Sequence, residues 1–259
     1  MEEIPANCKI ETAYNSMHLV RDRGRLELRS HDKALQSVIN LDQPEHLELA
    51  NLQSLVSVFL FIPAPRRVLM LGTAAGSLLH FLRHHFPEAH ITAVDIDETL
   101  IQQLRQMGVL PPPSDQLEYH YGDAARFISD CEHSYDLVIF DVFDGAQTPA
   151  WLRDETTLEQ LYRVTAKGGA LALNLLIDSD HDFGQFYRSC QRRFNDSSLS
   201  LPVDGLENRI VFAVREARPP RDMTANIETA MMLSEQLDID LTRILSVIYN
   251  TNPSGRGLI

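Results

Sequence analysis

The sequence has few cysteines, a single tryptophan and no long apolar run. Cys8, Cys131 and Cys190 are odd in number and far apart, which indicates reduced structural thiols rather than a disulfide framework or a CxxC metal site. The longest apolar run, residues 55–62, has eight residues, whereas a membrane span needs about 20. The N-terminal stretch MEEIPANCKI has neither the basic start nor the apolar segment of a secretory signal. We therefore expect a cytoplasmic protein with no membrane partner.

Positive charge is also scarce. The chain has 23 Lys and Arg against 36 Asp and Glu, a formal net charge of -13. Because this charge repels phosphate backbones, we expect no nucleic-acid partner, whereas a cationic small molecule is compatible with it. The histidines have no convincing ligand spacing, since His84 and His85 are adjacent on a predicted helix and do not share a face. We expect no metal.

The N-terminal part of the chain is typical of small antiparallel strands. Residues 8–40 contain four short alternating segments, KIETAY, SMHLVRD, GRLELRS and ALQSVIN, separated by turn residues. They predict a β-meander within residues 1–44. Apolar positions between residues 45 and 62 then recur at helical spacing until Pro63 and Pro65 end the pattern. A helix is thus predicted to lead into the central domain.

Residues 66–215 alternate predicted strands with predicted helices. The strands are Val68–Leu71, Ile91–Val94, Leu117–Tyr121, Leu137–Asp141 and Ala170–Leu175. The helices lie near 76–86, 97–107, 123–130 and 153–166. Because strands separated by such helices pair in parallel through right-handed crossovers, the predicted fold class is α/β, a doubly wound, mostly parallel, Rossmann-like sheet.

The end of the chain follows a different pattern. SSLSLPVDG and ENRIVFAVRE are alternating runs separated by a turn at Asp204–Gly205, which predicts a closing antiparallel hairpin. The α/β domain is therefore assigned to residues 45–216, and residues 217–259 to a linker and a helical tail. We interpret the tail as a cap on the core or a dimer contact, so a homodimer remains one possibility.

A small-residue turn marks the candidate ligand site. In RRVLMLGTAAGSLLHFL, residues 66–82, an apolar strand runs into the turn Gly72–Gly76 and then into a helix. Asp95 ends the next strand about 20 residues downstream, where an acid accepts hydrogen bonds from ribose hydroxyls. The alternative is that Asp95 caps the following helix, although Asp97 is better placed for that role. The arrangement predicts a nucleoside site.

Asp123 follows Gly122 at a predicted helix start. It either caps that helix or accepts a hydrogen bond from an adenine amino group, with the amide of Ala124 donating to a ring nitrogen. The two roles are compatible.

Asp141 ends the fourth predicted strand, and Asp144 lies three residues further on. Two carboxylates in one apolar loop repel each other unless a cation lies near, so we interpret them as a functional pair. Trp151 follows this loop, either as a lid over an acceptor pocket or as part of the core.

Six short motifs occur in a specific order. They are Tyr14-Asn15, Gln36-Ser37 within SHDKALQS, GTAAG at Gly72 to Gly76, DID at Asp95 to Asp97, Gly122-Asp123, and DVFDG at Asp141 to Gly145. On these motifs, residues 13–216 resemble the spermidine synthase group of polyamine aminopropyltransferases, in which they read YQ, LDGxxQS, GGGDG, EID, GD and DSSDP. The catalytic domain of that group has the fold of class I S-adenosylmethionine-dependent methyltransferases.

The resemblance implies transfer of an aminopropyl group from decarboxylated S-adenosylmethionine to an amine, with release of methylthioadenosine. It implies decarboxylated S-adenosylmethionine or S-adenosylmethionine as donor, a cationic amine as acceptor and no metal. Asp141 would help to deprotonate the attacking amine and Asp144 would hold it. The nucleoside would be bound at Asn15, Gln36, Gly72, Gly76, Asp95, Ile96, Gly122, Asp123, Ala124 and Asp141.

The chain also departs from the family pattern. Ala75 replaces the turn aspartate, His46-Leu47 replaces a tyrosine-histidine pair, and Gly145 replaces a proline, although Glu48 is retained. The sequence is closer to divergent members in which DxFDG is followed by NL, here Asn174-Leu175. Three hypotheses therefore stay open: an aminopropyltransferase, a methyltransferase, or a non-catalytic nucleoside-binding relative. Methyltransferases typically carry an acid at the position of Met70.

Overall fold

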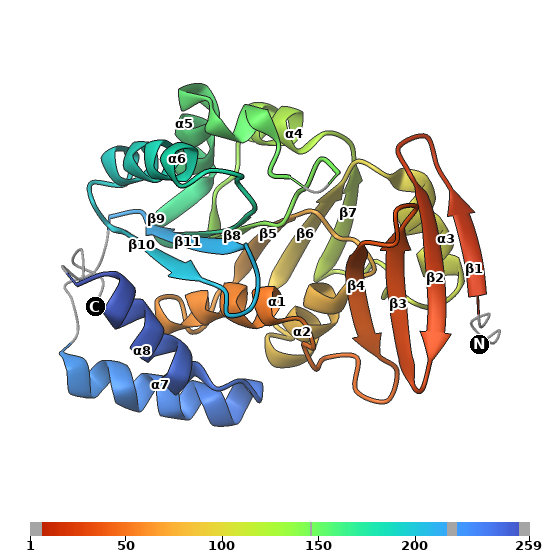
Figure 1. Cartoon of the computed structure of the whole chain (residues 1–259), viewed down its shortest axis with the longest axis horizontal. Helices are drawn as coiled ribbons and strands as arrows, with labels where there is room; N and C mark the ends of the chain where they lie inside the picture. Colours follow the sequence, from red (N-terminus) through yellow and green to blue (C-terminus); the bar gives the residue numbers. More distant parts are fainter. Residues whose placement is uncertain (1–6, 146, 217–221, 254–259) are drawn as a thin grey trace.

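The computed structural model describes residues 7–145, 147–216 and 222–253. These residues form a four-stranded N-terminal sheet, a seven-stranded central sheet with helices on both faces, and a pair of C-terminal helices (Figure 1). The predicted fold class is confirmed. No described helix combines the length and the apolar character that crossing a bilayer would require.

The N-terminal sheet is an antiparallel meander in the order β1-β2-β3-β4. Its strands are β1 (Asn7–Glu11), β2 (Ser16–Asp22), β3 (Arg25–Ser30) and β4 (Leu35–Asn40). Alternate side chains of β3, Leu26 and Leu28, are fully buried, as expected for a sheet with one face on the core. The four predicted strands are thus confirmed.

The central sheet has the order β10-β11-β9-β8-β5-β6-β7. Its parallel strands are β5 (Arg67–Leu71), β6 (His90–Asp95), β7 (Leu117–Tyr121), β8 (Tyr135–Phe140) and β9 (Thr165–Leu175). The predicted hairpin, β10 (Ser198–Pro202) and β11 (Arg209–Val214), adds two antiparallel strands. The chain changes direction across the sheet between β5 and β8, and ligands of such sheets bind at the carboxyl ends of the strands at this switch point.

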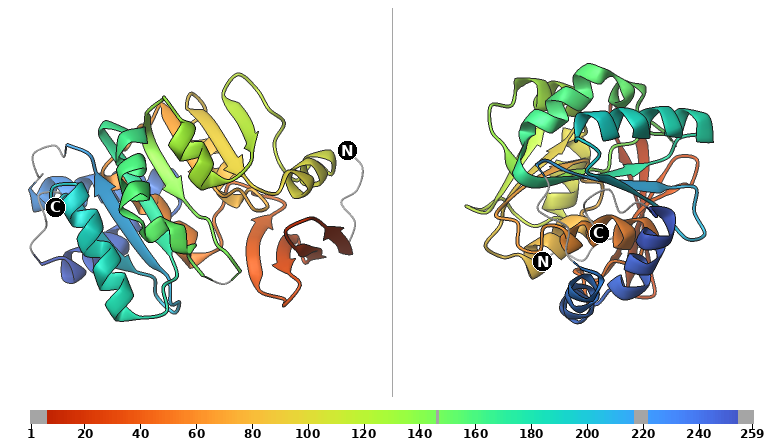
Figure 2. Two further views of the ribbon diagram at one scale, coloured as in Figure 1. Left: turned by 90° about the horizontal axis from the view of Figure 1, so that it is seen from above. Right: turned by 90° about the vertical axis from the view of Figure 1, so that its left-hand side faces the viewer.

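Helices cover both faces of the sheet, as the end-on view in Figure 2 shows. One core contains Val68 and Met70 of β5, and the other contains Leu69 and Leu71, because successive side chains of a strand point to opposite faces. The helical segments are α1 (Ala50–Leu55), η1 (Val56–Leu60), α2 (Ser77–His85), α3 (Glu98–Gln106), α4 (Ala124–Asp130), η2 (Ala150–Arg153), α5 (Glu155–Val164), α6 (Asp180–Arg193), α7 (Met223–Leu237) and α8 (Leu241–Thr251).

Two helices differ from the prediction. The helix expected over residues 45–62 begins only at Ala50; in the segment before it, Leu47 is buried and Glu48 forms an ion pair with Arg25 of the meander. Helix α6 was not predicted, although Phe183, Phe186 and Cys190 supply a buried apolar stripe. Its many polar residues obscure that stripe in the sequence.

The C-terminal helices pack on the core, with α7 against η1 and α8 against β10. Asn252, at the end of α8, hydrogen-bonds to the edge strand β10. Its Oδ1 accepts from the Ser200 amide at 3.0 Å, and its Nδ2 donates to the Ser200 carbonyl at 2.8 Å. These contacts agree with the interpretation of the tail as a cap; the predicted linker at 217–221 lies outside the described residues.

We expect Asn252→Ala to lower the free energy of unfolding by about 1–3 kcal/mol, because it leaves both backbone groups of Ser200 without this partner. Urea unfolding measures the change. Asn250→Ala, at an exposed position of the same helix, is the control and should change it by less than about 0.5 kcal/mol. Equal losses in the two variants would contradict the docking role of Asn252.

Candidate functional site

A cavity of ≈ 430 Å³ lies between the carboxyl edge of the central sheet and the meander. This volume is in the range of small-molecule sites. Nine of the residues predicted from the sequence line it: Asn15, Gln36, Gly72, Asp95, Ile96, Asp123, Ala124, Asp141 and Asp144.

Gly76 and Gly122, which were also predicted to bind the nucleoside, do not line the cavity. Gly76 caps α2 with a φ of 90°, and a Cβ there would lie 2.2 Å from Leu110 Cδ2. The Gly122 amide donates to the Asp95 carbonyl at 2.9 Å. Both glycines therefore shape the turns that carry the site.

Gly72 brings the first turn against the strand end that carries Asp141. Its φ is +88°, and a Cβ at this position would lie 2.3 Å from the Asp141 carbonyl oxygen. The Asp141 amide donates to the Leu71 carbonyl at 2.8 Å, and the Gly72 amide to the Val94 carbonyl at 2.9 Å. The ends of β5, β6 and β8 are thereby held together at the switch point.

Asp95 closes the glycine turn from the end of β6. Its Oδ2 accepts from the Thr73 amide at 2.8 Å and the Ala74 amide at 3.4 Å, and its Oδ1 accepts from the Asp97 amide at 3.0 Å. Burial raises the pKa of this carboxyl, and the amide hydrogen bonds oppose the shift. Oδ1, which accepts one hydrogen bond, still has lone-pair capacity for another donor, such as a ribose hydroxyl.

Asp97 and Asp123 are both helix caps. Asp97 accepts from the Leu100 amide at 3.0 Å, as predicted, and its Oδ2 accepts from the Thr12 hydroxyl at 2.6 Å. That second bond links α3 to the β1–β2 turn of the meander. Asp123 is exposed at the cavity and accepts from the Arg126 amide at 2.8 Å through Oδ1. Its capping alternative is thus observed, and its adenine contact stays a prediction.

Asp141 lies half-buried at the end of β8. Asn174 Nδ2 donates to its Oδ1 at 2.8 Å. Burial raises the pKa of Asp141 to about 6, while this hydrogen bond opposes the shift. Asp144 lines the same cavity but is exposed. The expected repulsion between the two carboxylates is therefore not what perturbs Asp141; the cause is desolvation.

In the sequence, Asn174 stands out only as part of the dipeptide Asn174-Leu175. In the structure it is fully buried in β9, and its Oδ1 accepts from Asn208 Nδ2 at 3.0 Å. An amide inside the apolar run ALALNLL was the available signal, since a buried polar side chain needs partners.

Trp151 lies at the boundary between the cavity and the core, and its role as a lid stays a prediction. It lines the cavity, and its ring packs edge-on against Phe140 with centroids 5.6 Å apart. It is therefore a wall of the site fixed to the core.

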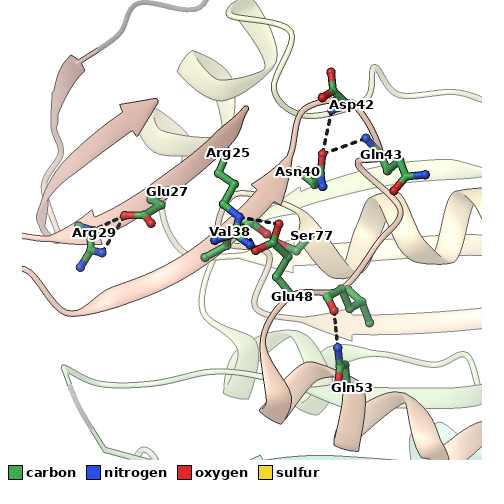
Figure 3. Close-up of polar contacts among 11 residues, drawn as sticks. Arg25, Glu27, Arg29, Val38, Asn40, Asp42, Gln43, Glu48, Gln53 and Ser77 are labelled. Atoms are coloured by element: carbon green, nitrogen blue, oxygen red, sulfur yellow. Dashed lines mark hydrogen bonds and ion pairs between the residues drawn. The ribbon is translucent and has the colours of Figure 1, made fainter. Parts of the chain in front are cut away.

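Of the positions that depart from the family pattern, Ala75 and His46 do not line the cavity, and neither does the retained Glu48. Ala75 is fully buried in the apolar core, and His46 Nδ1 lies 3.3 Å from an Asp238 carboxylate oxygen beyond α7. Glu48 turns to Arg25 of the meander, as Figure 3 shows, with Nε and Oε2 2.8 Å apart. Gly145, by contrast, does line the cavity.

The cavity is strongly acidic. Five aspartates line it, and the described lining residues include no lysine, arginine or histidine. They are Asp95, Asp97, Asp123, Asp141 and Asp144. Such a lining attracts a cationic ligand and disfavours an anionic one. Within the described ranges, no group of three or more His, Cys, Asp or Glu side chains could hold a metal ion.

The chain is similar to known proteins. Residues 53–174 match the family model "Spermine/spermidine synthase domain". The chain is 26% identical over 221 residues to a polyamine aminopropyltransferase of Neisseria meningitidis serogroup A, covering 85% of this chain and 84% of that protein.

Two solved structures share the fold. A probable spermidine synthase from Corynebacterium glutamicum superposes with a TM-score of 0.76 at 20% identity, covering 88% of each chain. Human Methyltransferase-like protein 13 in complex with SAH superposes with a TM-score of 0.61 at 24% identity, covering 73% of this chain and 89% of that one. The resemblance predicted from the motifs is confirmed, as is the methyltransferase-like fold.

Gly72→Ala is expected to lower the free energy of unfolding by roughly 3–5 kcal/mol, because its Cβ meets the Asp141 carbonyl in addition to requiring a positive φ. Gly108→Ala is the matched control, with a φ of +70° and nothing within 4 Å of the added atom. It should lose only about 1–2 kcal/mol. Urea unfolding compares the two, and similar losses would remove the close approach as the cause.

Asp141→Asn should stabilise the folded protein at neutral pH. The folded pKa is about 6 against an ordinary 3.8, so the native state binds more protons and loses stability as pH rises between those values. The amide variant does not carry this cost and should gain up to about 3 kcal/mol above pH 6. Urea unfolding at pH 7.5 and 5.0 measures it, and the gain should shrink at pH 5.0. Asp144→Asn, at an exposed position, is the control; an equal gain there would contradict the role of burial.

Proposed function

We propose that the chain is an aminopropyltransferase-like enzyme that moves the three-carbon amine of decarboxylated S-adenosylmethionine to an amine acceptor and releases methylthioadenosine. The observation that carries the proposal is the acidic lining without a basic side chain among its described residues. The decarboxylated donor has a sulfonium and an ammonium and no carboxylate. Intact S-adenosylmethionine would bring a carboxylate for which these residues offer no cationic partner.

In this proposal the nucleoside lies across the carboxyl edge of the sheet. Asp95, already fixed by three backbone amides, would accept from the ribose hydroxyls. Asp123 would take the adenine amino group, with the amide of Ala124 donating to a ring nitrogen. Asn15 and Gln36, which line the cavity from the meander, would close the site on that side.

Asp141 would accept the proton of the attacking amine. An alkylammonium has no free electron pair, and a carboxylate whose pKa is raised to about 6 is a better base than an ordinary aspartate. The amine nitrogen would form a bond to the carbon beside the sulfonium while the carbon–sulfur bond breaks. The electron pair of the breaking carbon–sulfur bond would stay on sulfur, so that neutral methylthioadenosine leaves. The proton of the amine would pass through Asp141 to solvent.

The remaining acidic groups would hold the amines. Asp144 lies in the same loop as Asp141 and lines the cavity, so we assign it to the acceptor amine. The donor amine cannot use the turn position occupied by Ala75, which is buried in the core. It would rely on the cavity carboxylates instead. Methyltransferases typically carry an acid at the position of Met70, which is an apolar, buried side chain here.

Calorimetry with three ligands tests the choice of donor. We expect decarboxylated S-adenosylmethionine and methylthioadenosine to bind at least about tenfold more tightly than S-adenosylmethionine, because only the last carries a carboxylate into the acidic cavity. Tighter binding of S-adenosylmethionine, with S-adenosylhomocysteine formed, would replace the proposal by a methyltransferase.

Methylthioadenosine release in the presence of diamines and longer polyamines tests the reaction. Asp141→Asn should reduce turnover by about 10²-fold or more while changing methylthioadenosine affinity little, since proton acceptance is lost and the ribose and adenine contacts of Asp95 and Asp123 remain. Glu48→Gln, which lies outside the cavity, is the control for activity. Ligand binding without turnover on any amine would favour the non-catalytic alternative.

A further inference from the structure

The buried side-chain amide of Asn174 lies between a hydrogen-bond acceptor, the Asp141 carboxylate, and a hydrogen-bond donor, the side-chain NH₂ group of Asn208. Its Nδ2 donates to Asp141 Oδ1 at 2.8 Å, and its Oδ1 accepts from Asn208 Nδ2 at 3.0 Å. An ionised carboxylate only accepts, so Asn174 must turn its NH₂ group toward Asp141 to stabilise the charged form. A flipped amide would instead face the carboxylate with its carbonyl oxygen.

Asn208 is held by the hairpin that ends the sheet. Its backbone carbonyl accepts from the Val203 amide at 3.1 Å, across the β10–β11 connection. The adjacent Arg209 forms an ion pair with Asp180 at the start of α6, and its guanidinium lies 4.5 Å from the centroid of the Phe183 ring. The backbone of Asn208 is thus held within the hairpin, and the residue that follows it is tied to α6.

We propose that Asn208 is a positioning residue that fixes the orientation of the Asn174 amide and thereby keeps Asp141 ionised. It acts from the hairpin, without lining the cavity itself. Its effect on turnover rests on the proposed function. Its effect on the protonation of Asp141 does not.

The surroundings give this single donor a large influence. Burial favours the protonated form of Asp141, and the cavity it lines with four other carboxylates offers, among its described residues, no cation to oppose that effect. The four are Asp95, Asp97, Asp123 and Asp144. Arg209, the nearest arginine along the hairpin, is paired with Asp180. Asn174 is the hydrogen-bond donor that counteracts desolvation of Asp141.

Asn208→Asp tests the orientation directly. An ionised aspartate of nearly the same shape can only accept, so it draws the Asn174 NH₂ group to itself and turns the carbonyl oxygen toward Asp141. The pKa of Asp141 should then rise by about one unit or more, a tenfold change in its protonation equilibrium. Carbon-detected NMR titration of aspartate carboxyl groups in the ligand-free protein measures it, with the Asp141 signal assigned by its loss in Asp141→Asn.

The matched control is Leu206→Asp, which adds the same charge to an exposed position of the same hairpin, 49% exposed and outside the amide chain. It should shift the Asp141 titration by much less. Asn208→Ala frees the amide without adding charge and should move the titration upward by a smaller amount. If Asn208→Asp does not fold, the titration of Asp141 in Asn208→Ala tests the proposal instead.

Equal shifts in Asn208→Asp and Leu206→Asp would overturn the proposal, as would an Asn208→Ala titration that superposes on that of the unchanged protein. The pH profile of methylthioadenosine release should move with the titration, its acidic limb shifting to higher pH by the same amount. Absence of turnover with every amine would instead reject the proposed function and leave the titration result standing.

Discussion

The close approach of Gly72 to the backbone of Asp141 is the constraint on which the site depends. A single methyl group at Gly72 would lie 2.3 Å from the Asp141 carbonyl, so the glycine turn and the end of β8 meet without any side chain between them. This contact occurs at the switch point of a doubly wound sheet, where the chain winds away to both sides and leaves a crevice. It places the nucleoside turn and the candidate base at one edge, from strands about 70 residues apart in the sequence.

The two carboxylates nearest this contact are kept in place at a cost in free energy. Burial disfavours the ionised form of both Asp95 and Asp141. Asp95 is compensated by backbone amides of the turn it closes, so its charge also stabilises the local fold. Asp141 is compensated by one side-chain amide, and its pKa stays near 6. The residual cost at Asp141 is the kind expected where a group serves chemistry rather than stability.

Much of the fold and part of the site were predictable from local pattern. Apolar runs bounded by small residues located β5 to β9, and parallel pairing then brought the residues after each strand to one edge, as observed for Asp95, Asp123 and Asp141. The role of Asn174 was not predictable, because it depends on the pairing of β8 with β9 and of β9 with β11. Helix α6 was missed because charged and polar residues interrupt its apolar stripe. Gly76 and Gly122 were assigned to the ligand from motif position, whereas their backbones shape the turns.

The departures from the family pattern leave the strand-end carboxylates of the cavity in place. Sheet topology requires the glycine turn and the strand-end carboxylates to converge, and these are retained. Recognition of amines depends on side chains from loops, which can be reassigned without moving the sheet. His46, one of the departures, faces Asp238 at the end of α7, and even the retained Glu48 faces Arg25 rather than the cavity. If the proposed function holds, selection among amine acceptors would come from residues that do line the cavity, such as Asp144, Trp151 and the exposed Tyr14, and a change in acceptor would leave the proposed nucleoside half of the site intact.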